Sequence, residues 1–473
     1  MAKVNVLVEV KREQSDAFAM HGAAVESIDE TLNQAESVVA DLTGYGLEVT
    51  DEIAPVPLFP DRVVQEDPGF ITFASEEENR DVTAESVVVA AEVERASLEE
   101  LSAEDNVTVW ANSELTFFDG CGCEGERSVA ELDGDPSGTA FSEDLFDMAL
   151  SAGGIDCRPF RPAVTMAVIR DLLGVRRAWN DGFRGQNVVV GIIDDDVNRL
   201  YPVVGGLTHP DVPRPGSAPI TSHGSMCAAD VLVAAPAAKL YDYPFLGVPR
   251  SGGALAMFQA VLDQRRRDGT PHLTNNSYGF VGRPRREQAP NHEIWDINHP
   301  MHRKVREVIA SGAPAFFAAG NCGADCPSGK CDPSGIGPEK SIHASNSLAE
   351  VITVAAVNSR HQRIGYSSQG PGGFEQQKPD VASYSHLFGN SGPGRPADGG
   401  TSSFDNGTSA ATPVAAGVGA LLMSAFPGLR PDRLKQALIA GAINLGTPGW
   451  DANTGFGVVN AASSYELIRR GDI

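Results

Sequence analysis

The segment "FDNGTSAATPVAAGVGALLMSAF", residues 404–426, constrains the fold of this chain more than any other. A Gly-Thr-Ser turn leads directly into a helix-length stretch in which small and apolar residues cover every face. A helix without a polar side has to be buried, so the sequence predicts a large domain built around it. Ser409 lies at the N-terminal end, where the helix dipole and free backbone N–H groups suit a reaction that produces an oxyanion. Taken alone, the turn is equally compatible with a simple N-cap.

The length of 473 residues predicts two domains, or one large domain with an appendage. We find no run of about 18 apolar residues, and the start "MAKVNVLVEVKREQ" lacks the features of a secretory signal. We therefore expect a cytoplasmic protein without a membrane partner. The net charge of -25 makes nucleic acid an unsuitable ligand.

Charge divides the chain into two parts. Residues 1–150 carry 35 acidic and 7 basic side chains, whereas residues 151–473 carry 27 acidic and 30 basic ones. Adaptation of a whole organism to salt would make both parts acidic, so the break indicates an acidic appendage with a role of its own. A solvated acidic face without a partner is the alternative.

The first part has the pattern of a small α+β unit. Alternating and helical periodicities predict the order strand, helix, strand, helix, strand at 3–10, 27–46, 85–93, 97–106 and 107–118. Residues 119–162 are rich in Gly, Pro, Ser and acids and have no period, which indicates a linker.

From residue 163 the pattern changes to alternating buried strands and helices. Continuous apolar runs predict strands at 187–194, 238–245, 272–279, 313–321 and 351–357. Helical patterns between them predict an α/β domain with a doubly wound, mostly parallel sheet and helices on both faces. Asp194 and Asn321 fall at the carboxyl ends of two strands, where such sheets place their chemistry.

Six collinear blocks then point to a family. "VVVGIIDDDVN", "TSHGSMCAADVLVAAPAAKLY", "NNSYG", "AAGNCG", "VITVAAVNSRHQRIGYSSQGPGG" and "NGTSAATPVAAGVGALL" together resemble the subtilisin-like serine proteases over about 165–465. The order Asp, His, Ser is that of subtilisin and differs from chymotrypsin and the α/β-hydrolases. The resemblance implies a subtilisin-like catalytic domain at 163–473 that cleaves polypeptides without a cofactor.

By this resemblance, Ser409 is the nucleophile, His223 the general base and acid, and Asp194 the group that orients the imidazole. Asn321 is the side-chain donor of the oxyanion hole. Ser277, Tyr278 and Gly279 match the strip along which an extended substrate pairs. A serine hydroxyl needs a neighbouring base to become a nucleophile, which gives each of these residues a separate chemical task.

The match has departures. The family's Asp-Ser/Thr-Gly is replaced by Asp194, Asp195 and Asp196, and we expect the last two to point to solvent. Only 11 residues separate His223 from Ala235 and Pro236, too few for the calcium loop that relatives often carry, so we predict no metal.

Seven cysteines leave several states open. Cys322, Cys326 and Cys331 follow Asn321, with His343 beyond them. They could bind zinc, form one disulfide with a spare thiol, or stay as three thiols.

The N-terminal unit, 1–118, looks like the propeptide of these proteases, with a ferredoxin-like α+β fold. The resemblance implies an intramolecular inhibitor and a processing site within 119–162. We thus expect a serine endopeptidase made as a zymogen. A processing protease with few substrates and a catalytically silent binding protein remain as alternatives.

Overall fold

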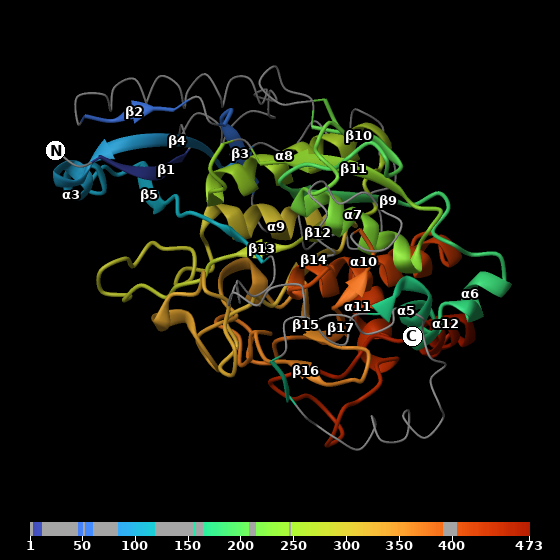
Figure 1. The fold of residues 1–473 in the computed structure, drawn as a ribbon. Coiled ribbons are helices and arrows are strands. Elements are labelled where there is room, and N and C mark those ends of the chain that lie inside the picture. Colours follow the sequence, from blue (N-terminus) through green and yellow to red (C-terminus); the bar gives the residue numbers. More distant parts are fainter. Residues whose placement is uncertain are drawn as a thin grey trace.

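A computed structural model describes residues 3–11, 46–50, 53–59, 84–118, 155–157, 164–207, 214–245, 247–390 and 404–473 (Figure 1). The chain forms a small N-terminal sheet and a large nine-stranded sheet with helices packed on both faces. This arrangement confirms the predicted doubly wound domain.

The large sheet has the order β10-β11-β9-β12-β14-β15-β16-β7, and β17 also pairs with β15. All its described pairs are parallel except β15 with β16. Its strands are β7 (Ile155–Asp156), β9 (Val189–Asp194), β10 (Val203–Gly206), β11 (Lys239–Pro244), β12 (Leu273–Asn276), β14 (Ala315–Ala318), β15 (Ile352–Val357), β16 (Arg363–Ile364) and β17 (Val381–Tyr384). The predicted strand 272–279 is instead divided, because β13 (Tyr278–Gly279) leaves this sheet and pairs elsewhere.

Two hydrophobic cores lie on opposite faces of the sheet. One includes apolar residues of α7 and α10, and the other includes those of α8 and α9. The helices are α5 (Met166–Leu173), α6 (Arg176–Asn180), α7 (His223–Ala234), α8 (Ser251–Asp268), α9 (Pro300–Ala310), α10 (Thr408–Ala425), α11 (Pro431–Ala440) and α12 (Ala461–Arg470). Short elements complete the domain: β8 (Val164–Thr165), β18 (Leu387–Phe388) and the 3-10 turns Pro333–Gly335 and Ala344–Ser347.

The helix α10 occupies the centre predicted for it. All its residues from Thr408 to Met423 are buried. A Cβ atom on Gly417 would lie 2.3 Å from the carbonyl oxygen of Val231, so glycine allows α10 to approach α7 closely. Among the described helices α10 alone has the length and hydropathy to cross a membrane, but 89% of it is buried inside the protein, as in a core helix.

The N-terminal sheet has the order β2-β4-β1-β5, with β3 also paired to β4, and all its pairs are antiparallel. Its elements are β1 (Lys3–Lys11), β2 (Glu48–Val49), β3 (Val56–Leu58), β4 (Ser86–Glu94), β5 (Val107–Ala111), the 3-10 turn Arg95–Ser97 and α3 (Leu98–Leu101). The predicted helix 27–46 lies outside the described residues except for its last residue, so the ferredoxin-like arrangement stays a prediction. The expected strand 107–118 is wrong in one respect: it ends at Ala111, and β6 (Thr116–Phe117) joins β13 of the large domain.

This sheet packs on the outer side of α8 and α9 (Figure 1). Leu7 and Trp110 share a buried cluster with Leu255 of α8. Arg303 of α9 forms an ion pair with the buried Glu9 at 2.6 Å, and Lys304 donates to the carbonyl of Pro57 at 2.6 Å. Apolar and charged contacts thus attach the N-terminal unit to the large domain.

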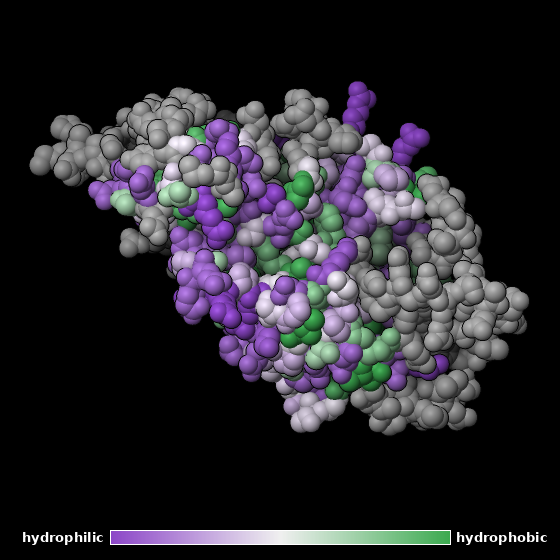
Figure 2. All heavy atoms as spheres, turned by 60° about the vertical axis from the view of Figure 1, so that its left-hand side comes forward, coloured by the Kyte–Doolittle hydropathy of each residue, from purple (hydrophilic) through white to green (hydrophobic). Residues whose placement is uncertain are grey.

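The described surface on the face in Figure 2 is mostly hydrophilic, with smaller hydrophobic areas between. Exposed large apolar side chains are few among the described residues, for example Leu200 and Ile155. The apolar residues are therefore concentrated in the two cores of the large domain and in the buried clusters of the N-terminal unit.

Candidate active site

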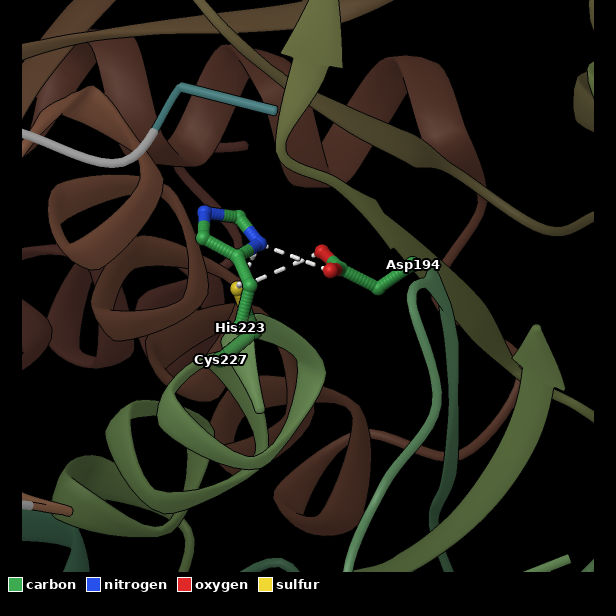
Figure 3. Close-up of side chains that lie close together, drawn as sticks. All are labelled: Asp194, His223 and Cys227. Atoms are coloured by element: carbon green, nitrogen blue, oxygen red, sulfur yellow. Dashed lines mark hydrogen bonds and ion pairs between the residues drawn. The ribbon is translucent and has the colours of Figure 1, made fainter. Parts of the chain in front are cut away.

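Asp194 and His223 face each other because β9 ends at the first and α7 begins at the second. Nδ1 of His223 lies 2.7 Å from Oδ1 of Asp194, whose side chain is fully buried. The N–H of Asp195 donates to the same oxygen at 2.8 Å. Since the carboxylate accepts, we assign the ring hydrogen to Nδ1, which leaves Nε2 as the basic nitrogen of a neutral imidazole. Figure 3 shows the ring and the carboxylate pointing toward each other.

Cys227 lies one helical turn beyond His223 and beneath this pair (Figure 3). Its Sγ is 3.5 Å from Oδ2 of Asp194, 4.0 Å from Nδ1 of His223 and 3.6 Å from the carbonyl oxygen of Ser409. The sulfur atom thus contacts the side chains of Asp194 and His223 and the backbone carbonyl of Ser409.

Asp194, His223 and Cys227 also offer ligand atoms within 4.8 Å of one another, close enough to hold a metal ion. Burial and the charge of Asp194 raise the pKa of the Cys227 thiol well above its usual range. The thiolate that a metal requires is therefore disfavoured, and the geometry suits a hydrogen-bonded pair better than a metal centre.

The acidic turn after Asp194 differs from our expectation. Asp196 is buried, with φ of 107°, and accepts the N–H of Val197 at 2.7 Å. Asp195 is exposed in part, yet its carboxylate accepts the N–H groups of Gly224 at 2.7 Å and His223 at 3.1 Å. The prediction that both point to solvent is wrong for Asp196, which is buried. Asp195 is exposed as predicted, but the free N–H groups at the start of α7 also bind its carboxylate.

Two of the carboxyl groups near this turn have raised pKa values. Burial and the charge of Asp194 raise the pKa of Asp195 to about 6. Burial, followed by its hydrogen bond with Asp196, raises the pKa of Asp242 to about 9. Asp242 is therefore protonated at neutral pH, which relieves repulsion from Asp196.

Ser409 is the second residue of α10 and is buried. Its Oγ donates to the carbonyl oxygen of Ser277 at 3.1 Å, and the Ser277 hydroxyl donates to the carbonyl of Ser409 at 3.3 Å. Gly407 precedes the helix with φ of 83°, a conformation that glycine adopts without strain. The hydroxyl thus lies at the positive end of the central helix, as the sequence predicts.

Asn321 is held in one orientation by Thr408. Its Oδ1 accepts the backbone N–H and the hydroxyl of Thr408, both at 2.9 Å. Nδ2 is consequently the donor on the other side, and it lies 2.7 Å from the carbonyl oxygen of Phe118. The amide therefore binds a peptide carbonyl at the place where an oxyanion hole would act.

The predicted substrate strip holds the end of the N-terminal unit. Strand β6 pairs antiparallel with β13, so that Phe117 lies opposite Tyr278 and Thr116 opposite Gly279. The N–H of Phe118 donates to the carbonyl of Ser277 at 3.0 Å. The structure thus brings Ser277, Tyr278 and Gly279 together with a peptide strand from the same chain.

The sequence did not identify Phe117 and Phe118 as site residues. The Phe117 ring lies 5.3 Å from the His223 ring, and Phe118 is 4% exposed. The available signal was two consecutive aromatic residues at the end of a predicted strand, directly before the linker. Thr408 and Cys227 were also missed, since their roles depend on neighbours far away in the sequence.

The cysteine loop contains two disulfides. Cys322 pairs with Cys331, and Cys157 pairs with Cys326. All three alternatives from the sequence are therefore wrong: the zinc site, the single disulfide with a spare thiol, and the three free thiols. Cys157 lies within the predicted linker, 119–162, and was not considered as a partner. The linker prediction is wrong at 155–156, because β7 pairs with β16 in the large sheet and so brings Cys157 to Cys326. Cys227 is a free, buried thiol.

Comparison with known proteins identifies the family. The sequence profile described as the subtilase family matches residues 185–457. Subtilisin DY of Bacillus licheniformis is 28% identical over 286 residues, which cover 58% of this chain and 90% of that protein. Subtilisin E of Bacillus subtilis is 25% identical over 361 residues, covering 72% of this chain and 79% of that one.

Fervidolysin of Fervidobacterium pennivorans is similar in sequence and in structure. The two sequences are 24% identical over 322 residues, covering 63% of this chain and 43% of fervidolysin. Its crystal structure, described as that of a keratinolytic enzyme related to subtilisin, superposes with a TM-score of 0.57 and 16% identity. That superposition covers 98% of this chain and 61% of the fervidolysin chain, and it supports the fold alone. The chain belongs to the subtilase family and is a subtilisin-like serine endopeptidase.

Proposed function

We propose that this endopeptidase is made as a zymogen and cuts peptide bonds with Ser409, His223 and Asp194 as its catalytic triad. One observation carries the proposal: the carbonyl of Phe118 accepts from the Asn321 amide while the N–H of Phe118 donates to Ser277. A peptide bond of the chain itself is thus presented as a substrate, with its carbonyl oxygen on the oxyanion donor.

In the proposed reaction the Ser409 hydroxyl breaks its hydrogen bond with the Ser277 carbonyl, and its oxygen attacks the substrate carbonyl carbon. His223 Nε2 accepts its proton, and Asp194 stabilises the imidazolium that results. Asn321 Nδ2 donates to the oxyanion until the C–N bond breaks and His223 returns the proton to the leaving amine. Water then hydrolyses the acyl-enzyme through the same groups.

The bond after the Phe118 carbonyl is Phe118–Asp119, which we propose as the processing site. It joins the predicted prodomain, 1–118, to the predicted linker, 119–162. Once this bond is cut, the carboxylate of Phe118 remains at the oxyanion donor, and β6 still covers the strip that other substrates need. The N-terminal unit would therefore inhibit the enzyme until it dissociates.

Further contacts support the inhibitory role. Ser113 donates its N–H and its hydroxyl to Glu293 at 2.9 and 2.8 Å, and Gly252 donates to Asn112 at 2.9 Å. These bonds flank the segment that leads from β5 to β6. They hold the peptide in register with the site, which is the requirement for cutting one defined bond.

Mass spectrometry of the purified protein tests the proposal. We expect the wild-type protein to yield a fragment that begins at Asp119, and Ser409→Ala to remain full length and unlabelled by a fluorophosphonate. Ser424→Ala, at the far end of α10, is the matched control and should be processed normally. A wild-type protein that hydrolyses peptides but stays uncut would refute the zymogen proposal, and labelling of Ser409→Ala would refute the triad.

The two disulfides also bear on location. Disulfides persist in oxidising compartments and are rare in a reducing cytosol. We therefore propose, against our expectation from the sequence, that the protein works in an oxidising compartment. Immunodetection in cell fractions tests this, and an active protein found only in the cytosol with free thiols would contradict it.

A further inference from the structure

We propose that Phe245 makes the substrate cleft selective for an aromatic residue at the second position before the cleaved bond. Together with the pocket for the first position, it directs the enzyme to extended segments with two adjacent aromatic residues. This inference rests on the proposed function and concerns the same site.

The first position is occupied by Phe118, whose side chain enters a space that two glycines leave open. A Cβ atom on Gly279 would lie 2.7 Å from Cζ of Phe118, and one on Gly320 would lie 3.5 Å from it. Any side chain at residue 279 would therefore displace the ring. A large planar side chain fits here because both positions lack one.

The second position is occupied by Phe117, which lies between two rings of the large domain. The centroids of Phe117 and Phe245 are 5.8 Å apart with an interplanar angle of 73°, an edge-to-face contact. The opposite neighbour is His223, at 5.3 Å and 38°. An aromatic side chain at this position thus contacts both the catalytic base and Phe245.

Phe245 is itself held in place. It follows β11 and makes an edge-to-face contact with Tyr278, with centroids 5.0 Å apart and planes at 88°. A Cβ atom on Gly253 of α8 would lie 3.1 Å from its ring, so the side chain fills the space at that glycine. Phe245 is 9% exposed with β6 in place, so its neighbours, Phe117 among them, cover most of the ring. A fixed ring selects its partner better than a mobile one, because little conformational entropy is lost on binding.

The two preceding positions of the strand, Thr116 and Leu115, differ in how closely the protein surrounds them. Thr116 is half-buried, whereas Leu115 is 5% exposed and packs in the cluster that contains Phe245 and Tyr278. The substrate that the cleft fits best therefore has the pattern Leu-x-Phe-Phe. Since β13 binds it by strand pairing, the segment has to be extended, as in an unfolded or loosely folded protein.

Fluorogenic peptides test the inference on the self-processed enzyme after active-site titration. We compare Leu-Thr-Phe-Phe with Leu-Thr-Ala-Phe, each coupled to aminomethylcoumarin, for the wild type, Phe245→Ala and Phe245→Leu. With the wild-type enzyme, kcat/KM should be about tenfold lower for Leu-Thr-Ala-Phe than for Leu-Thr-Phe-Phe, because the alanine peptide cannot form the edge-to-face aromatic pair. In both variants the two peptides should differ by less than about threefold, because the loss of the Phe245 ring lowers kcat/KM more for the Phe-Phe peptide than for the alanine peptide.

The outcomes separate this inference from the proposed function. If the wild type cuts both peptides equally well, or if the variants keep the wild-type preference, the role of Phe245 is refuted while the protease stands. If no peptide and no unfolded casein is cut by a protein that has the native melting curve, the proposed function fails first. Melting curves and fluorophosphonate labelling of the variants show whether they are folded and active.

Discussion

Acid should release the N-terminal unit from the large domain, because two histidines, the buried His299 and the half-buried His292, bind it in their neutral form. Nε2 of His299 lies 3.0 Å from the carbonyl of Ala111, and Nε2 of His292 lies 3.2 Å from the hydroxyl of Ser113. Their Nδ1 atoms accept backbone N–H groups, those of Met301 and Ile294. The His299 ring thus donates from Nε2 and accepts at Nδ1, an arrangement that protonation destroys. The His292 ring has the same pattern, but its Nδ1 also lies 3.1 Å from Oε2 of Glu293, which offsets part of the effect.

The charges around these rings fix the sign of the effect. Burial lowers the pKa of both His292 and His299, although Glu293 opposes this for both and Asp296 and Glu9 oppose it for His299. Charge interactions with His299 and His292 hold the pKa of Glu293 at about 2, so it stays ionised. A histidine with a lowered pKa binds fewer protons in the complex than after release. The affinity of the complex is therefore complete above the ordinary value of 6.5 and falls as the pH drops below it.

The ordinary pKa also limits the magnitude. One pH unit below 6.5, each histidine can weaken the complex by at most about tenfold, or 1.4 kcal/mol, and both together by at most about 100-fold. The neighbouring His302 also has a lowered pKa, through burial, but it bonds within the large domain to Ser345 and the carbonyl of Glu293. We expect it to contribute little to release.

Size-exclusion chromatography of the self-processed complex at pH 7.5, 6.5 and 5.5 measures the fraction released. The double variant His292→Gln, His299→Gln retains side-chain N–H donors but does not titrate, so its release should depend weakly on pH. His361→Gln is the matched control, because His361 contacts Tyr384 on another side of the domain. A wild-type complex that is equally stable at pH 7.5 and 5.5, or a double variant that behaves like the wild type, would refute the reasoning.

Three other predictions concern the site and the interface. Gly279→Ala should displace the Phe118 ring and slow self-processing, because overpacking is expected to cost about 1–3 kcal/mol in the free energy of binding of the Phe118 segment. A time course of the full-length band on a denaturing gel measures the rate of self-processing, and an unchanged rate would contradict the pocket assignment. Asn321→Ala should lower kcat by roughly 10²–10³-fold, the loss known for this donor in a subtilisin, with little change in KM. Steady-state kinetics on an unfolded protein substrate measures both constants, and a change in KM as large as that in kcat would contradict the oxyanion role. Arg303→Ala leaves the carboxylate of Glu9 buried with only Ser86 and Trp110 as partners; removal of one partner from a buried ion pair costs about 3–5 kcal/mol, so release at pH 7.5 should be faster, whereas an unchanged rate would show that the pair contributes nothing.

The sequence predicted most of the large domain because its signals are local. Continuous apolar runs gave β9, β11, β14 and β15 within a few residues, and the small-residue segment gave the buried α10. The prediction failed at 272–279, where one predicted strand serves two sheets. Nothing within that segment marks the residue at which the strand turns from the large sheet to the substrate strand.

The predicted site residues lie together, but several of their partners could not be predicted. Asp194 and His223 follow from the order of the blocks, whereas the position of Cys227 beneath them depends on how α7 packs against α10. Likewise, Asp196 faces inward, where its side chain meets Asp242 on the neighbouring strand. The three consecutive aspartates do not by themselves indicate which side chain is buried.

By itself the sequence determined the buried helix, most of the strands along the chain and the family, since each of these depends on a local run or block of residues. Only the tertiary structure decided which cysteines pair, and which peptide bond lies at Asn321. The physical reason is the same in both cases. These contacts join residues between 9 and 203 positions apart, and their geometry is fixed by the packing of whole elements rather than by neighbours along the chain.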